Sequence, residues 1–139
     1  LGLPDQNLVM SGYTKKNLGD VENQAPKFDM RAEMDARFAR TDLQGETLGL
    51  SILKLDPGFR IPFGHKHTGQ EEVYVVVRGS GRVKVEDEVV ELRQWDAVRF
   101  DKDTMRNMEA GPDGIESLGF GAGDDPMDAD MVPGWWSKD

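Results

Sequence analysis

The sequence predicts a single-domain, all-β protein of the sandwich or barrel type. Short segments rich in Val, Ile, Leu and Phe are separated by many of the 16 glycines and 7 prolines, residues that favour turns. Within these segments apolar and polar residues tend to alternate, and the 3.6-residue period of an amphipathic helix is missing. A chain of 139 residues is a usual length for one domain and can bury a core without a disulfide or a structural metal.

The N-terminal part is expected to be an arm followed by two strands. Residues 1–33 begin with a polar, Asn- and Gly-rich stretch and are interpreted as the arm. Met34–Arg40 then reads as an edge strand and Thr47–Leu55 as a stronger one. The second strand has leucines on both parities, so it is either bulged or buried on both faces.

The strands that follow are expected to complete a barrel over residues 34–122. Glu72–Arg78 is an unbroken β-branched and aromatic run that residues 79–81 are expected to end as a turn. A hairpin around Asp87 is expected next. Further turns at residues 101–103 and 111–114 separate the last candidates. The strand candidates of this part are Glu72–Arg78, Arg82–Glu86, Glu88–Leu92, Ala97–Phe100, Met105–Ala110 and Ile115–Ala122.

The segment of residues 123–139 is an acidic C-terminal tail with an apolar end. It contains five aspartates against the single Lys138, and Trp135 and Trp136 lie close to its end. A flexible tail would leave two adjacent tryptophans in water, which exposes much apolar surface. We therefore expect the tail to dock on the barrel.

Charge and composition exclude several classes of function. The formal net charge is −9, with 17 basic and 26 acidic side chains, and nucleic-acid-binding proteins instead concentrate Lys and Arg. The longest apolar run, Val73–Val77, is far shorter than the roughly 18 residues of a membrane span. No cysteine is present, so any metal must be held by imidazole and oxygen. We expect no nucleic-acid or membrane partner and, without a signal-peptide pattern at the start of the sequence, a cytoplasmic location.

Both histidines of the chain occur as His65-Lys66-His67. On a strand, residues i and i+2 point to the same face, so two imidazoles would project side by side. Phe63 has the same parity and would line the site. Glu72, at the start of the next strand, could add a carboxylate and complete a two-His, one-carboxylate set with open coordination positions. The alternative is that the histidines lie on a solvated face or loop.

Residues 57–79 resemble the first motif of the cupin superfamily, commonly written G-x5-H-x-H-x3-4-E-x6-G. His65 and His67 match, Glu72 follows after four residues, and Gly79 follows Glu72 after six. The leading glycine of the motif is displaced by one position. The similarity extends over most of the expected barrel.

The resemblance implies a small jelly-roll β-barrel, often dimeric, with a metal site inside. The implied ligands are His65, His67 and Glu72, and the implied cofactor is a divalent first-row ion such as Zn, Fe, Ni or Mn. Glu71 also fits the histidine spacing, but it leaves seven residues before Gly79, so Glu72 is preferred.

The second cupin motif, G-x5-P-x-G-x2-H-x3-N, fits poorly. Arg106 stands where the motif has its histidine, and a guanidinium has no lone pair for a metal. Three interpretations follow. Arg106 binds an anionic group of a ligand beside a three-ligand metal; or it pairs with Glu72 and leaves a metal-free pocket; or the register shifts by one, Asn107 faces inward and Arg106 is solvated.

Two classes of function therefore remain. One is a metal-dependent enzyme that acts on a small, anionic organic molecule, and the other is a non-catalytic protein that binds or senses a small ligand. In either case Arg106, Phe63 and Tyr74 are the expected ligand-binding residues. The sequence shows no second acid or base that would define a reaction.

A homodimer is also expected. If Glu72 and Tyr74 point into the barrel, then Val73, Val75 and Val77 face outward and form an apolar row that needs a cover. A second copy of the chain would supply that cover, and the alternative is that the chain's own terminal arms do so.

Overall fold

The computed structural model describes residues 9–10, 12–29, 32–125 and 127–139. Within these residues the strands are β1 (Val9–Met10), β2 (Tyr13–Thr14), β3 (Met34–Phe38), β4 (Leu48–Leu55), β5 (Phe63–His67), β6 (Glu71–Val85), β7 (Glu88–Arg93), β8 (Ala97–Phe100), β9 (Arg106–Ala122) and β10 (Ala129–Pro133). The helical elements are the 3₁₀ turns η1 (Leu18–Asp20) and η2 (Ala25–Phe28) and the single-turn α1 (Arg40–Leu43). The expected all-β class is confirmed.

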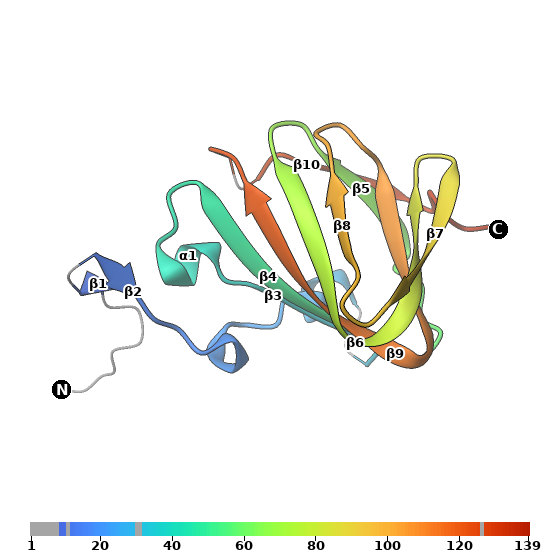
Figure 1. Ribbon diagram of the computed structural model, residues 1–139, viewed down its shortest axis with the longest axis horizontal. Coiled ribbons are helices and arrows are strands. Elements are labelled where there is room, and N and C mark those ends of the chain that lie inside the picture. The colour runs from blue at the N-terminus through green and yellow to red at the C-terminus, as the bar shows by residue number, and fades with distance from the viewer. Residues whose placement is uncertain (1–8, 11, 30–31, 126) are drawn as a thin grey trace.

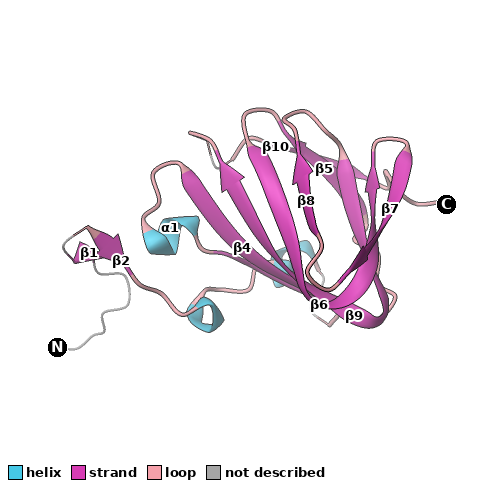
Figure 2. Ribbon diagram, viewed as in Figure 1, coloured by secondary structure: helices cyan, strands magenta, loops and turns pink. Residues whose placement is uncertain are grey.

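Strands β3 to β10 form one sheet that curls into a jelly roll, whereas β1 and β2 pair separately (Figures 1 and 2). The long strands β6 and β9 pair with each other along most of their length. One half of the curled sheet has the order β3-β4-β9-β6-β8, and the other half has the order β7-β6-β9-β5-β10. All these pairs are antiparallel, so β6 and β9 carry the chain from one half to the other.

The turns expected at residues 79–81 and 111–114 are wrong, because β6 and β9 run through both segments. The pairing register shifts here instead, and residues 111–114 lie opposite a single residue of β6. Gly79 has a φ of +79°, and a Cβ on it would lie 2.1 Å from the carbonyl oxygen of Gly114. The glycines therefore permit a bulge where the two long strands bend together.

Two other expectations about the strands are confirmed. The β6–β7 hairpin turns at residues 86–87 and pairs Val83 with Val90. β3 is an edge strand of the described sheet, where it pairs with β4. β4 pairs with β9 from Leu48 to Leu55 without a shift of register. Its leucines on both parities therefore reflect partial burial on both faces rather than a bulge.

The hydrophobic core lies inside the curled sheet and is formed by side chains from both halves. Its largest apolar members lie on β6, β8 and β9. The pairing of β6 with β9 brings these side chains together, so the core depends on it. The most deeply buried of these side chains are Val76, Val83, Phe100, Met108 and Ile115. No helix in the described part of the chain is long and apolar enough to span a membrane.

The acidic tail docks on the sheet, as expected. Its strand β10 pairs with β5 along five residues, and the Trp136 side chain is only 2% exposed. The guanidinium carbons of Arg60 and Arg82 lie 4.0 and 5.2 Å from the centre of the Trp136 ring. We call these three residues the tryptophan clamp. Gly64 on β5 makes room for the other indole, since a Cβ there would lie 2.7 Å from the Trp135 ring.

Candidate metal centre

Strand β5 holds both histidines in one orientation. His65 and His67 are two residues apart on the strand, so their side chains emerge on the same face. Their rings pack edge to face with centres 5.1 Å apart. β10 flanks the strand on one side, and His65 pairs with Arg106 of β9 on the other. Neighbours on both sides fix the position of the strand and with it the spacing of the two imidazoles.

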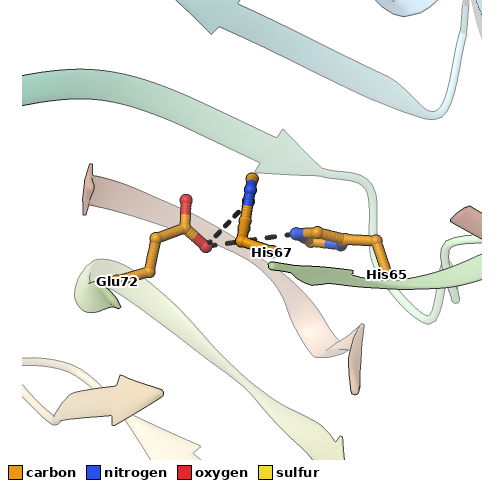
Figure 3. Close-up of side chains that lie close together, drawn as sticks. All are labelled: His65, His67 and Glu72. Carbon is orange, nitrogen blue, oxygen red and sulfur yellow. Dashed lines mark ion pairs between the residues drawn. The ribbon is translucent and has the colours of Figure 1, made fainter. Parts of the chain in front are cut away.

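Glu72 completes a converging set of three ligand groups (Figure 3). One ligand atom each from His65, His67 and Glu72 lie within 4.8 Å of one another. Oε1 of Glu72 is 3.5 Å from Nε2 of His67 and 4.0 Å from Nε2 of His65. A metal at about 2.1 Å from each ligand can span ligands up to about 4.2 Å apart. The two gaps from Glu72 to the histidines lie within that limit.

Glu71 takes no part in this set. Its carboxylate is exposed and accepts a hydrogen bond of 2.8 Å from Arg99. Alternation along β6 therefore sends Glu71 outward and Glu72 inward.

Asp128, from the tail, orients His67. Its Oδ1 lies 2.7 Å from Nδ1 of His67 and accepts a hydrogen bond of 2.7 Å from the side chain of Gln70, and its Oδ2 accepts one of 2.7 Å from the backbone amide of Gly69. Burial works to raise the pKa of Asp128, but these hydrogen bonds outweigh burial and hold the pKa below its usual value. An ionised carboxylate only accepts. Nδ1 of His67 therefore donates to Asp128, and Nε2 is the ring nitrogen that faces Glu72.

His65 is held in its neutral form. Burial, the charge of Arg106 and the neighbouring His67 lower the pKa of His65 to about 3. At neutral pH its ring therefore carries a free lone pair, which is the form that binds a metal. The hydroxyl of Tyr74 lies 3.5 Å from Nε2 of His65, and burial, first of all, raises the pKa of Tyr74 so that this hydroxyl stays protonated.

Arg106 points into the barrel and is 1% exposed. Its Nη2 donates a hydrogen bond to Oε1 of Glu72, and its Nη1 donates to the carbonyl of Thr104 at 2.9 Å. The interpretation with a shifted register is therefore wrong. Asn107 is also buried, but it donates to the carbonyl of Ile61 at 3.0 Å and takes no part in the cluster. The ion pair of the second interpretation is present, together with the three converging ligands of the first.

The other two expected ligand-binding residues lie beside the cluster. Phe63 shares the parity of the histidines on β5, and its ring centre is 5.8 Å from that of Phe28 in η2. Tyr74 packs against Phe100 with ring centres 4.8 Å apart and reaches His65 with its hydroxyl. Of these two residues, Tyr74 is the one that contacts a ligand of the cluster, His65.

The residues present fit a divalent first-row ion. Two imidazoles and a carboxylate are a donor set that such ions accept. The Asp128 hydrogen bond to His67 is the outer contact that usually accompanies a metal-bound histidine. His65, His67 and Glu72 would hold the ion, and a bound ion would supply Lewis-acid chemistry to a ligand at its open positions.

Sequence reasoning missed Asp128 and Gln70. Asp128 is one of five aspartates in the tail, and its separation from His67 by 61 residues has no motif to mark it. The tail's tryptophans predicted docking, but docking alone does not say which aspartate meets the histidine. The paired strands β5 and β10 provide that information.

Comparisons with known proteins agree with this architecture. Residues 51–113 match the family model described as "Cupin domain", and a search of curated protein sequences finds no match. Among solved structures, a cupin protein from Bacteroides fragilis has a TM-score of 0.67 at 24% identity, covering 85% of this chain and 90% of that one.

Two further solved structures are enzymes. Oxalate decarboxylase from Bacillus subtilis, in a structure that concerns its Mn(II) centres, has a TM-score of 0.70 at 22% identity and covers 87% of this chain but only 32% of its own. A structure of DMSP lyases has a TM-score of 0.63 at 18% identity, covering 71% and 52% of the two chains. The chain thus spans about a third of the decarboxylase chain and half of the lyase chain. At these identities the likeness concerns the fold.

Proposed function

We propose that the chain is a member of the cupin superfamily, and that it binds a divalent first-row metal ion through His65, His67 and Glu72 and acts on or binds a small anionic organic molecule there. The observation that carries the proposal is the convergence of the three ligand atoms within 4.8 Å together with the fixed Nδ1–H of His67. Arg106, in the place where cupins have their last histidine ligand, provides a buried positive charge for the anion.

The neighbour with Mn(II) centres makes manganese the first ion to test, and Zn, Fe and Ni are the other candidates. The partial exposure of the His65 side chain, 25%, supports access of a small molecule to the ion. No reaction is assigned, because among the described residues the converging group consists of the three ligands His65, His67 and Glu72, and this group does not identify a separate acid or base.

A second function has its own supporting observation. The hydrogen bond from Arg106 to Oε1 of Glu72 neutralises the carboxylate, as expected of a metal-free pocket that binds a small ligand without catalysis. The two proposals differ in whether purified protein takes up a metal at this site.

Substitution of His67 with alanine tests the metal site. We expect wild-type protein, purified without a metal-affinity tag, to bind one equivalent of Mn(II) or Zn(II), and His67→Ala to lose that binding, because a set of two protein ligands holds such ions weakly. Elemental analysis after dialysis measures the bound metal.

Lys66→Ala is the matched control, since Lys66 lies between the histidines but its amine is directed to Asp103 at 3.9 Å. This variant should keep the metal. A full equivalent of metal on His67→Ala would place the metal elsewhere, and no metal on the wild type would favour the metal-free binding protein.

We also propose a homodimer through one face of the sheet. Residues directly paired across antiparallel strands share a face, and the pairing of β4, β9 and β6 aligns two apolar rows on the face opposite Glu72 and Tyr74. The rows are Leu50, Phe120 and Val73, and Ile52, Leu118 and Val75. Phe120 is still 36% exposed. Such a surface is expected to be covered by a second copy of the chain.

Light scattering at micromolar concentration should give a mass near twice 15.5 kDa. Phe120→Asp should shift the mass toward one copy, because a charge would be buried in the contact. Phe38→Asp is the control. Phe38 is 56% exposed, but it pairs with Ser51, whose side chain points to the other face of β4 from Leu50 and Ile52. A monomeric wild type would instead mean that the terminal arms alone cover the valines.

A further inference from the structure

One oxygen atom of the site has two competing partners. Oε1 of Glu72 accepts the hydrogen bond from Nη2 of Arg106, and the same atom is the one nearest to both histidine nitrogens, at 3.5 and 4.0 Å. A metal ion between the histidines and Glu72 would share this oxygen with the guanidinium. A bound ion therefore weakens the ion pair of Arg106.

Arg106 has no other counter-ion among the described residues. It forms an ion pair with Glu72 alone, its Nη1 donates to a backbone carbonyl, and its buried Nε has no hydrogen-bond partner. Its guanidinium carbon lies 4.8 Å from the centre of the Phe100 ring and 5.9 Å from that of Tyr74. A buried charge in such surroundings is strongly unfavourable once its partner is withdrawn.

The charges near the site indicate what would restore the balance. Glu72 is the one ion-pair partner of Arg106 among the described residues. A metal ion that takes up the Glu72 carboxylate would therefore leave the positive charge of Arg106 without a counter-ion. A small monoanion would compensate it, and the unpaired Nε of Arg106, together with an adjacent Nη, is the edge of a guanidinium that suits two carboxylate oxygens.

We infer that the metal ion and a small monocarboxylate bind to this protein cooperatively, with the carboxylate replacing Glu72 as the partner of Arg106. The inference rests on the proposed metal site and adds the class of ligand and the coupling. Each ligand removes the cost that opposes the other: the anion frees Glu72 for the metal, and the metal frees Arg106 for the anion. Such coupling is reciprocal, so each ligand must strengthen binding of the other by the same factor.

Calorimetric titration of metal-free protein with Mn(II) tests the coupling. In acetate the Mn(II) affinity should rise by about fivefold or more over its value in the same concentration of acetamide, which has the same shape without the charge. Acetate that merely complexed Mn(II) in solution would lower the apparent affinity. In the reverse titration, Mn(II) should raise the affinity of the protein for acetate by the same factor.

Arg106→Gln gives the distinguishing result. Because the competitor for Glu72 is removed, this variant should bind Mn(II) more tightly than wild type when no carboxylate is present, and acetate should no longer raise the affinity. Arg99→Gln is the control for the loss of one positive charge, since Arg99 is 54% exposed and pairs with Glu71 and Asp101. Its Mn(II) affinity, and the rise of that affinity in acetate, should equal those of wild type.

The outcomes separate this inference from the proposal beneath it. Mn(II) that binds equally in acetate and acetamide overturns the coupling and leaves the metal site standing, whereas Mn(II) that binds in neither overturns the metal site itself. Weaker Mn(II) binding to a folded Arg106→Gln also overturns the coupling. Should that variant fail to fold, the wild-type titrations still decide between coupled and independent binding.

Discussion

Substitution of Trp136 with alanine is expected to lower the free energy of unfolding by about 3–5 kcal/mol. The Trp136 side chain is 2% exposed, and the tryptophan clamp places Arg60 and Arg82 on its ring. Removal of the indole would leave a cavity and would take away the ring on which the guanidinium of Arg60 packs at 4.0 Å. The hydrogen bonds of Arg60 to the backbone carbonyl at that position and to Glu109 do not involve the indole.

Urea unfolding followed by circular dichroism measures this loss. Trp95→Ala is the matched control, because Trp95 is 69% exposed and its removal should change stability by less than about 0.5 kcal/mol. Equal unfolding midpoints for Trp136→Ala and wild type would show that the clamp does not stabilise the barrel.

Asp128→Asn is expected to weaken binding of the metal ion by about 10–100-fold. The carboxylate accepts from His67, Gly69 and Gln70 at once, and an amide offers one acceptor oxygen in place of two. Part of the population would then turn the asparagine NH₂ toward Nδ1 of His67. That contact favours the wrong tautomer, in which Nε2 carries the proton and cannot bind a metal.

The control is Asp130→Asn, which removes the same charge from an exposed position on β10. Its Mn(II) affinity should match that of wild type in calorimetric titrations. If both variants lost affinity equally, the effect of Asp128 would be one of net charge. If neither did, the orientation of His67 would be independent of the tail.

Local patterns predicted much of the fold. Alternation located β3, β4, β7 and β8, and turn residues located the hairpin at Asp87. The prediction failed where glycines had two possible roles. Gly79 and Gly81 are as suited to a bulge as to a turn, and only the pairing of β6 with β9, which involves residues far apart in the sequence, decides between them.

In the candidate site, too, local sequence patterns predicted some residues and missed contacts between distant parts of the chain. His65, His67 and Glu72 follow from strand alternation and a short motif, and they do converge. The partner of Arg106 does not follow from the sequence, because sequence spacing does not specify which strands face each other. The contact between His67 and Asp128 was missed because it joins β5 to the tail, where no periodicity links the two residues.

The late position of β10 in the chain has a consequence for biosynthesis. His67 leaves the ribosome 61 residues before Asp128, an interval of roughly 3–12 s at about 5–20 residues per second. Until then β5 lacks its neighbour on that edge, and the imidazole lacks the carboxylate that orients it. The nascent barrel therefore passes through a stage with an open sheet edge, and the candidate metal centre is completed only after β10 and Asp128 have been synthesised.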